Sequence, residues 1–344
     1  MAASHPVVFQ NVHSGHGNAA RLHERIAGGL AARGLGVDFF VRGDGESLHG
    51  AIVSAATRAA ECGAPLVAVG GDGTVNLVAR AALEHGLALG IVPTGTYNFV
   101  ARSHGVPETL DGALDLIASG TAHPIRIGRL NERRFLVNAS IGLYARLLSE
   151  RETLTRRLGR RRAVAMLAAA LSALRSHRPL ELSIRHHGVT RRAVATTFIV
   201  GNNAFQLELV GVADVPADGV DELAAVLLHP VGRATLLAMI LRGQRGEVRA
   251  TPELESFLFD TMDIDVPRRR ARRISVALDG EIVRETLPLA FSVEPRPLLL
   301  LRPPRADELA GGLSGAPSGE APGRATIGAA SGGTAGRTAG GDAT

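Results

Sequence analysis

A glycine-rich turn near residue 70 carries the residue types that phosphate binding requires. Gly70-Gly71-Asp72-Gly73-Thr74 follows a short apolar run and precedes a helical pattern of apolar residues. The glycines let the backbone turn sharply, and amides at the start of a helix point toward an anion with the helix dipole behind them. Asp72 adds a carboxylate, which gains nothing in a loop that binds only anions. A carboxylate is useful there if the loop binds a metal-bound nucleotide or positions a hydroxyl group. The alternative is an ordinary tight turn between a strand and a helix.

The basic residues narrow the kind of phosphate site. All 38 of them are arginine, because the chain contains no lysine. A Walker-type phosphate loop, the strand lysine of protein kinases and Schiff-base chemistry all require lysine, so these classes are excluded. Any phosphate must therefore be held by backbone amides, hydroxyl groups and arginine.

The first 124 residues alternate between predicted strands and helices. Strands are predicted at 7–10, 35–41, 66–69 and 87–92, and helices at 19–33, 47–63, 99–104 and 110–119, besides the helix after the glycine turn. This alternation predicts a parallel sheet covered by helices, with ligand sites at the carboxyl ends of the strands. Two further polar turns, 11–17 and 93–98, fall at such ends. Ser14 and the glycine amides of the first one are placed to meet the same phosphates as the turn at Gly70.

The pattern changes at about residue 125. Short alternating runs at 135–140, 180–186, 193–200 and 222–228 predict antiparallel β structure, interrupted by helices at 157–176 and 231–242. Further strands are predicted at 274–278, 289–293 and 298–301. A tail rich in Gly, Ala, Ser and Thr follows, and we expect it to be disordered. The predicted organisation is an α/β domain over 1–124, a β-rich domain over 125–302 and a tail over 303–344.

Charge and hydropathy bear on partners and location. With 45% hydrophobic residues the chain can bury a full core, and its net charge of +5 reflects arginine clusters at 156–162 and 268–273. Such clusters are usually solvated, but they can also attract anionic lipid. The absence of Trp argues against stacking on nucleic acid. The N-terminus has no secretory pattern, and the longest apolar run, 163–174, is shorter than the roughly twenty residues of a membrane span. We expect a cytoplasmic protein with peripheral contact at the inner membrane surface, and no nucleic-acid partner; the oligomeric state stays open.

Histidine and cysteine form no recognisable metal motif. The chain has twelve histidines, but no HExxH or paired helical spacing, and His186-His187 lies near a predicted turn. We therefore expect no structural zinc site. The single cysteine, Cys62, cannot form an internal disulfide, and we expect it to be a small buried hydrophobe.

The ordered set of motifs resembles a known family. GGDGTVN at 70–76, with NVHSG at 11–15 and PTGTYNFVARSHGVP at 93–107, resembles the catalytic region of diacylglycerol kinase-like lipid kinases. The likeness continues through FLVNASIGLYARLLSERE at 135–152, TTFIVGNNAFQL at 196–207, ADG at 217–219 and LDGE at 278–281. The glycine-aspartate motif alone is shared with NAD kinases and phosphofructokinases, so the specificity comes from the whole set.

The resemblance implies ATP-dependent transfer of the γ-phosphoryl group to a lipid hydroxyl with Mg²⁺, the nucleotide lying between an α/β domain and a β-sandwich domain. It assigns the catalytic base to Glu281, or to Asp279 beside it, and a magnesium site in the second domain to Asp218. The nucleotide and its phosphates would be bound by Asn11, Ser14, Gly15, Gly70, Gly71, Asp72, Gly73, Thr74, Asn76 and Thr96.

Three positions depart from the family pattern. Family members often carry Pro where this chain has Val12, Leu where it has Thr94, and Asp or His where it has Phe99. The departures at Thr94 and Phe99 leave open a catalytically inactive regulator that binds nucleotide or lipid. A kinase of a soluble acceptor such as NAD, on the same nucleotide fold, also stays open. The sequence does not identify the residues that face the phosphate acceptor. The acceptor therefore stays open among diacylglycerol, a sphingoid base and related lipids.

Overall fold

The computed structural model describes residues 5–11, 19–42, 46–158, 178–202, 222–232, 235–236, 253–267 and 271–304. Three predicted site residues, Ser14, Gly15 and Asp218, lie outside the described residues. So do the tail from residue 305, most of the predicted helices 157–176 and 231–242, and part of the arginine cluster 268–273.

The N-terminal part is built on a six-stranded sheet. Its strand order is β2 (Asp38–Val41), β1 (Val7–Gln10), β3 (Leu66–Gly70), β4 (Ala88–Pro93), β18 (Leu298–Leu301) and β5 (Ala122–Ile125). The first five strands run parallel, and β5 pairs antiparallel with β18. The predicted parallel α/β architecture is confirmed. The last strand returns to this sheet from the far end of the β-rich segment.

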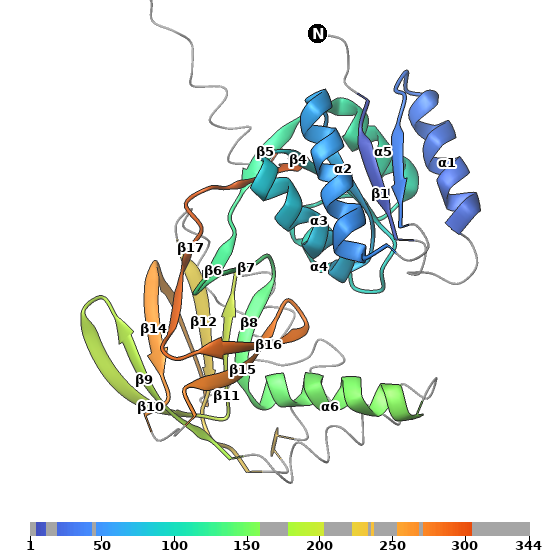
Figure 1. Ribbon diagram of the computed structural model, residues 1–344. Coiled ribbons are helices and arrows are strands. Elements are labelled where there is room, and N and C mark those ends of the chain that lie inside the picture. The colour runs from blue at the N-terminus through green and yellow to red at the C-terminus, as the bar shows by residue number, and fades with distance from the viewer. Residues whose placement is uncertain are drawn as a thin grey trace, which may run out of the picture. The chain divides into compact units, whose positions relative to one another are not determined.

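Helices cover both faces of this sheet (Figure 1). α2 (Leu48–Cys62) and α3 (Asp72–His85) pack on one face, and α1 (Ala19–Ala31) and α5 (Leu110–Ser119) pack on the other. A short helix, α4 (Phe99–Ser103), follows β4. Ser47 caps α2 by accepting a hydrogen bond from the Gly50 amide, a contact worth about 1 kcal/mol.

Cys62 is exposed, so the expectation of a buried cysteine is wrong. It is the last residue of α2, and the chain turns away at Gly63, which has a φ of 60°. The buried stripe of the helix ends one turn earlier, at Ala59.

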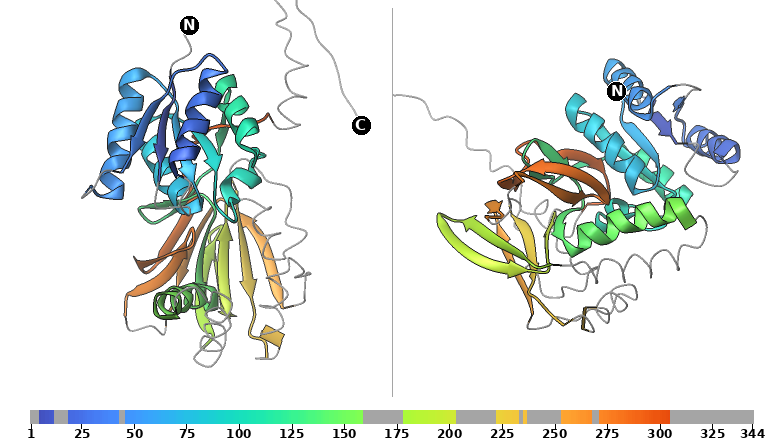
Figure 2. Two further views of the ribbon diagram at one scale, coloured as in Figure 1. Left: turned by 90° about the vertical axis from the view of Figure 1, so that its right-hand side faces the viewer. Right: turned by 60° about the horizontal axis from the view of Figure 1, so that its bottom comes forward.

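The C-terminal part consists of two antiparallel sheets of six strands (Figure 2). The first has the order β10 (Val189–Ala195), β9 (Leu180–His186), β14 (Thr261–Asp265), β17 (Leu289–Val293), β6 (Gly128–Leu130) and β7 (Arg133–Phe135). The second has the order β13 (Leu254–Phe259), β12 (Leu223–Leu228), β11 (Thr197–Gly201), β8 (Asn138–Gly142), β15 (Arg273–Leu278) and β16 (Glu281–Thr286). One apolar cluster draws residues from both sheets, including Phe135, Phe198 and Phe259. The predicted antiparallel β-sandwich is confirmed.

The main differences from the predicted elements occur where a strand changes sheet. The run 193–200 is divided at Thr196 between β10 in one sheet and β11 in the other. The run 135–140 is likewise divided between β7 and β8. A continuous alternating pattern does not reveal such a switch, because each half keeps its own alternation.

The helix α6 (Leu143–Leu158) was not predicted from the sequence. It begins directly after β8, and its sequence is largely polar. Leu143 and Leu147 pack with Leu228 in a small cluster of their own, so tertiary contacts rather than a strong apolar stripe explain its position. Among the helices of the described residues, none combines the length and the hydropathy needed to cross a bilayer.

Candidate active site

Three neighbouring strands end at one edge of the parallel sheet, and each is followed in the sequence by a polar turn. β3 lies between β1 and β4 and pairs in parallel with both, so the carboxyl ends of the three strands, at Gln10, Gly70 and Pro93, are neighbours. The residues that follow each strand carry the phosphate-binding motifs predicted from the sequence. Ligands of open α/β sheets bind at such an edge.

The turns are joined by direct contacts. Asn11 Nδ2 donates a hydrogen bond of 3.3 Å to Thr74 Oγ1, and the Thr94 amide donates one of 3.0 Å to the Gly70 carbonyl. Gly71 and Gly95 touch through their backbones, since a Cβ added to Gly95 would lie 2.7 Å from the Gly71 Cα. Two glycines are therefore required for the second and third turns to pack together.

The start of α3 is open toward this edge. Its N-cap residue is Gly71, which offers no side chain to cap the first-turn amides. The first amides of a helix have no acceptor within the helix, and the helix dipole adds partial positive charge there. This arrangement suits a phosphate group, as the sequence predicted.

Asp72 connects the second turn to the third. Its Oδ1 accepts a 2.6 Å hydrogen bond from the Phe99 amide, the first residue of α4. Burial raises the pKa of Asp72, and the amides of Phe99, Asn98 and Val100 act in the opposite direction. Asn98 stabilises the turn 93–98. Its side-chain oxygen accepts a hydrogen bond from the Gly95 amide, and its side-chain nitrogen donates one to the Gly95 carbonyl.

Phe99, the position where relatives often carry Asp or His, takes part through its backbone. The amide bonds Asp72, and the ring stacks on Tyr97 with centroids 5.3 Å apart. Any residue except proline could donate the same amide bond at this position. The substitution therefore leaves the Asp72 contact intact.

The remaining predicted nucleotide residues differ in exposure. Thr96 is exposed in the third turn. Asn76, the fifth residue of α3, is buried, and its Oδ1 has no hydrogen-bond partner in the part of the chain that the structure describes.

The second predicted group, Asp279 and Glu281, lies at the hairpin turn between β15 and β16. Asp279 and Gly280 have positive φ values of 50° and 86°, as a tight two-residue hairpin turn requires. The Asp279 carboxylate faces inward. Its Oδ1 accepts hydrogen bonds from the amides of Val137 at 2.8 Å and Asn138 at 3.2 Å, and its Oδ2 accepts one from Leu136 at 3.0 Å.

The environment of Asp279 changes its ionisation. Burial raises its pKa to about 6, against the opposing effect of the three backbone amides and of Arg80 on α3. The positive charge of Arg80 thus favours the ionised form of Asp279. Arg80 belongs to α3, the helix that begins at the glycine turn.

Glu281 has a different setting. It is the first residue of β16 and is exposed. No described residue forms a hydrogen bond or an ion pair with its carboxylate. Of the two carboxylates predicted as a base, Glu281 is the one not committed to holding the fold.

The loop 136–138 is held from its other side by Asn202. The Asn202 side-chain amide donates to the carbonyls of Arg126 and Leu136, at 2.7 Å and 3.2 Å, and its backbone amide donates to Val137. The Arg126 guanidinium bonds the Asn202 carbonyl in return. Asn202 is buried and holds this loop against Arg126. The roles of Arg126 and of this loop were missed, and the only signal was the FLVNAS motif itself.

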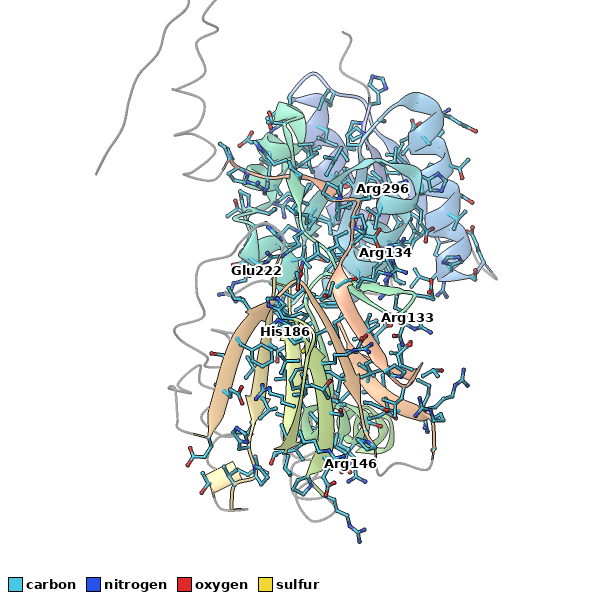
Figure 3. All side chains as sticks on the ribbon, turned by 90° about the vertical axis from the view of Figure 1, so that its left-hand side faces the viewer. Arg133, Arg134, Arg146, His186, Glu222 and Arg296 are labelled. Atoms are coloured by element: carbon cyan, nitrogen blue, oxygen red, sulfur yellow. The ribbon has the colours of Figure 1, made fainter. Side chains whose placement is uncertain are left out.

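Arginines near this region are mostly engaged in ion pairs. Arg133 pairs with Glu285 at 2.6 Å and Arg134 with Glu294 at 2.8 Å, and both carboxylates are about 10% exposed. Arg296 donates a hydrogen bond of 3.5 Å to the Leu83 carbonyl near the end of α3. Figure 3 labels these three arginines. These arginines therefore bind groups of the protein itself.

Two family descriptions match the two parts of the chain. "Diacylglycerol kinase catalytic domain" matches residues 5–130, and "YegS C-terminal NAD kinase beta sandwich-like domain" matches residues 139–302. The chain belongs to the diacylglycerol kinase-like lipid kinases. The family assignment rests on the α/β part and on the sandwich together.

Individual family members match over shorter stretches. A protein of Klebsiella pneumoniae named "Probable lipid kinase YegS-like" is 46% identical over 79 residues, 22% of this chain and 27% of that protein. The diacylglycerol kinase of Bacillus subtilis is 30% identical over 188 residues, 53% of this chain and 60% of that enzyme. The matched stretches thus span less than two thirds of these relatives.

A solved structure shows the same fold as this family member. A crystal structure of a diacylglycerol kinase from Bacillus anthracis superposes with a TM-score of 0.63 at 16% identity, covering 88% of this chain and 98% of the other. At this identity the likeness concerns the fold alone.

Proposed function

We propose that this lipid kinase family member uses ATP to phosphorylate the hydroxyl group of a lipid. The observation that carries the proposal is the edge where β1, β3 and β4 end side by side and where α3 begins without a side-chain cap. The backbone amides of Gly71, Asp72, Gly73 and Thr74, with Asn11, would hold the ATP phosphates. Phosphoryl transfer depends chiefly on such positioning and on neutralising charge at the transferred oxygens.

Mg²⁺ fits the residues at this edge. Asp72 supplies a carboxylate beside the phosphate-binding amides, and Mg²⁺ is commonly held by one or two carboxylates together with phosphate oxygens and water. When bound, the ion would neutralise charge on the phosphates. Asp218, the other predicted ligand, lies outside the described residues, and its role stays a prediction.

Glu281 is the base that we propose for the acceptor. Its carboxylate takes the proton of the lipid hydroxyl, the hydroxyl oxygen forms a bond with the γ-phosphorus, and the bond to the β-phosphate oxygen breaks to release ADP. Asp279 accepts three amide hydrogen bonds and is therefore proposed to hold the turn that presents Glu281. General-base assistance contributes about 10²–10⁴-fold to a rate.

The proposal is tested by transfer from labelled ATP with Mg²⁺ to a panel of lipids in mixed micelles. The panel contains diacylglycerol, a sphingoid base and related lipids, and NAD is assayed beside it without detergent. Labelling of one lipid by the unmutated protein, lost in Glu281→Gln, is the expected result and identifies the acceptor. Labelling of NAD alone would replace the lipid with a soluble acceptor. ATP binding without transfer to any acceptor would favour the inactive regulator instead.

We propose a catalytic α/β domain over 1–124, a β-rich domain over 125–302 and a tail over 303–344, with the last strand of the second segment, β18, pairing back into the sheet of the first. We further propose that the chain acts at the anionic inner membrane surface. Co-sedimentation with anionic vesicles that weakens as salt is raised is expected, and binding insensitive to salt would contradict an electrostatic contact.

A further inference from the structure

We propose that His186, His187 and Asp260 form a binding site for a divalent transition-metal ion such as Zn²⁺. One ligand atom from each of the three side chains lies within 4.8 Å of the other two. Two imidazole nitrogens and a carboxylate oxygen are a ligand set that Zn²⁺ and its first-row neighbours accept, with water completing the coordination. The site is separate from the proposed catalytic residues, which belong to the α/β part and to the other sheet.

Two chain connections bring these residues together: the hairpin turn between β9 and β10, and the passage from β13 of the second sheet to β14 of the first. His186 ends β9, and His187 and Gly188, with φ values of 48° and 75°, form the turn into β10. Asp260 precedes β14, whose Met262 is paired with His186 across the ladder. Residues 74 positions apart in the sequence thereby converge, with His186 labelled in Figure 3.

The three side chains are in direct contact, and one of their buried nitrogens lacks a partner among the described residues. The imidazole rings of His186 and His187 stack with centroids 3.9 Å apart, and His187 Nε2 lies 3.2 Å from Asp260 Oδ1. The buried Nε2 of His186 has no hydrogen-bond partner among the described residues. A buried polar atom without a partner is costly, and metal coordination by an imidazole within this cluster would relieve that cost.

Neighbouring residues leave Asp260 available and hold it in place. The nearby arginines are engaged with other carboxylates: Arg185 with Asp263 at 2.5 Å and Arg191 with Glu255 at 2.6 Å. The Thr261 amide donates a 2.6 Å hydrogen bond to Asp260 Oδ1. Bonds of this kind orient a carboxylate that ligates a metal.

The test uses the full chain without an affinity tag and two variants chosen to keep the fold. His187→Asn creates an Asn-Gly pair, the sequence preferred in a two-residue hairpin turn with positive φ. Asp260→Asn keeps an oxygen that can accept from Thr261. The matched control is His229→Ala, because His229 is half-buried and also pairs with a carboxylate, Glu255 at 3.5 Å, but forms no three-ligand cluster with the described residues.

Titration calorimetry with Zn²⁺ alone measures the binding. We expect one saturable equivalent per chain at this site, weakened at least about tenfold in His187→Asn and in Asp260→Asn and unchanged in His229→Ala. Zn²⁺ should also raise the Tm of the unmutated protein and of the control, but not that of the two site variants. Absence of saturable binding would overturn the proposal, as would equal affinity in all four proteins or equal loss in the control.

Discussion

Asp72 Oδ1 lies 2.6 Å from the backbone nitrogen of Phe99. The carboxylate of the glycine turn therefore caps α4, the helix that follows the turn 93–98. A residue expected to act on nucleotide or metal thus also holds two loops together. The two roles have different requirements. Capping needs an oxygen acceptor, whereas neutralising or coordinating a cation needs the negative charge.

Asp72→Ala and Asp72→Asn separate these roles. We expect alanine to lower the free energy of unfolding by about 1 kcal/mol through loss of the cap, while asparagine keeps most of the stability. Both variants should lose ATP-dependent transfer, because neither carries the charge. Urea denaturation and the lipid assay measure the two effects. Full activity in the asparagine variant would show that the charge of Asp72 is not needed.

Asp279 should make stability depend on pH. Its pKa is raised to about 6 in the folded chain, from an ordinary value of 3.8, so the folded state binds the proton more tightly than the unfolded state. The contribution of this group is therefore greatest below pH 3.8 and falls as the pH rises toward 6, by at most about 1.4 kcal/mol per pH unit.

Denaturation of the unmutated protein and of Asp279→Asn at several pH values between 4 and 7 isolates this contribution, because the asparagine does not titrate. The difference in unfolding free energy between the two proteins should change with pH in the stated direction. A difference that is constant across this range would contradict a raised pKa.

Glu281→Gln should affect catalysis without affecting the fold. The side chain is exposed and makes no hydrogen bond or ion pair with the described residues, so its Tm should match that of the unmutated protein. The rate should fall by about 10²–10⁴-fold if Glu281 is the base. Asp279→Asn provides the contrast, since it disturbs a carboxylate with three amide partners and should lower the Tm. Unchanged transfer by Glu281→Gln would remove it from the mechanism.

Gly95→Ala should separate the second and third turns. The added Cβ would lie 2.7 Å from the Gly71 Cα and 2.8 Å from Asn98 Oδ1, so one of these must move. We expect a loss of about 1–3 kcal/mol in stability and weaker ATP binding.

Gly73→Ala is the control for stability, because a Cβ at Gly73 meets no atom within 4 Å and lies inside α3, where alanine is the better helix former. It should keep or slightly raise the Tm. Equal destabilisation in Gly95→Ala and Gly73→Ala would argue against the close contact of the two turns.

The sequence by itself determined the elements that carry a strong local signal. The alternation of apolar runs, glycine turns and helical stripes up to Ser119 predicts the parallel sheet, and the motif order predicts the family. These features depend on contacts between residues close in the sequence, such as the Ser47 cap of α2, and such contacts leave short-range sequence patterns.

Only the tertiary structure decided which side chains meet across long separations. It returns β18 to the first sheet, turns Asp279 inward onto the amides of Leu136, Val137 and Asn138, and leaves Glu281 exposed two residues later. It also brings His186 and His187 to Asp260, although the spacing of the histidines had indicated no metal site. The physical reason is that strand pairing and burial depend on the whole sheet. The residues next to a turn residue in the sequence therefore do not determine whether its side chain points inward or outward.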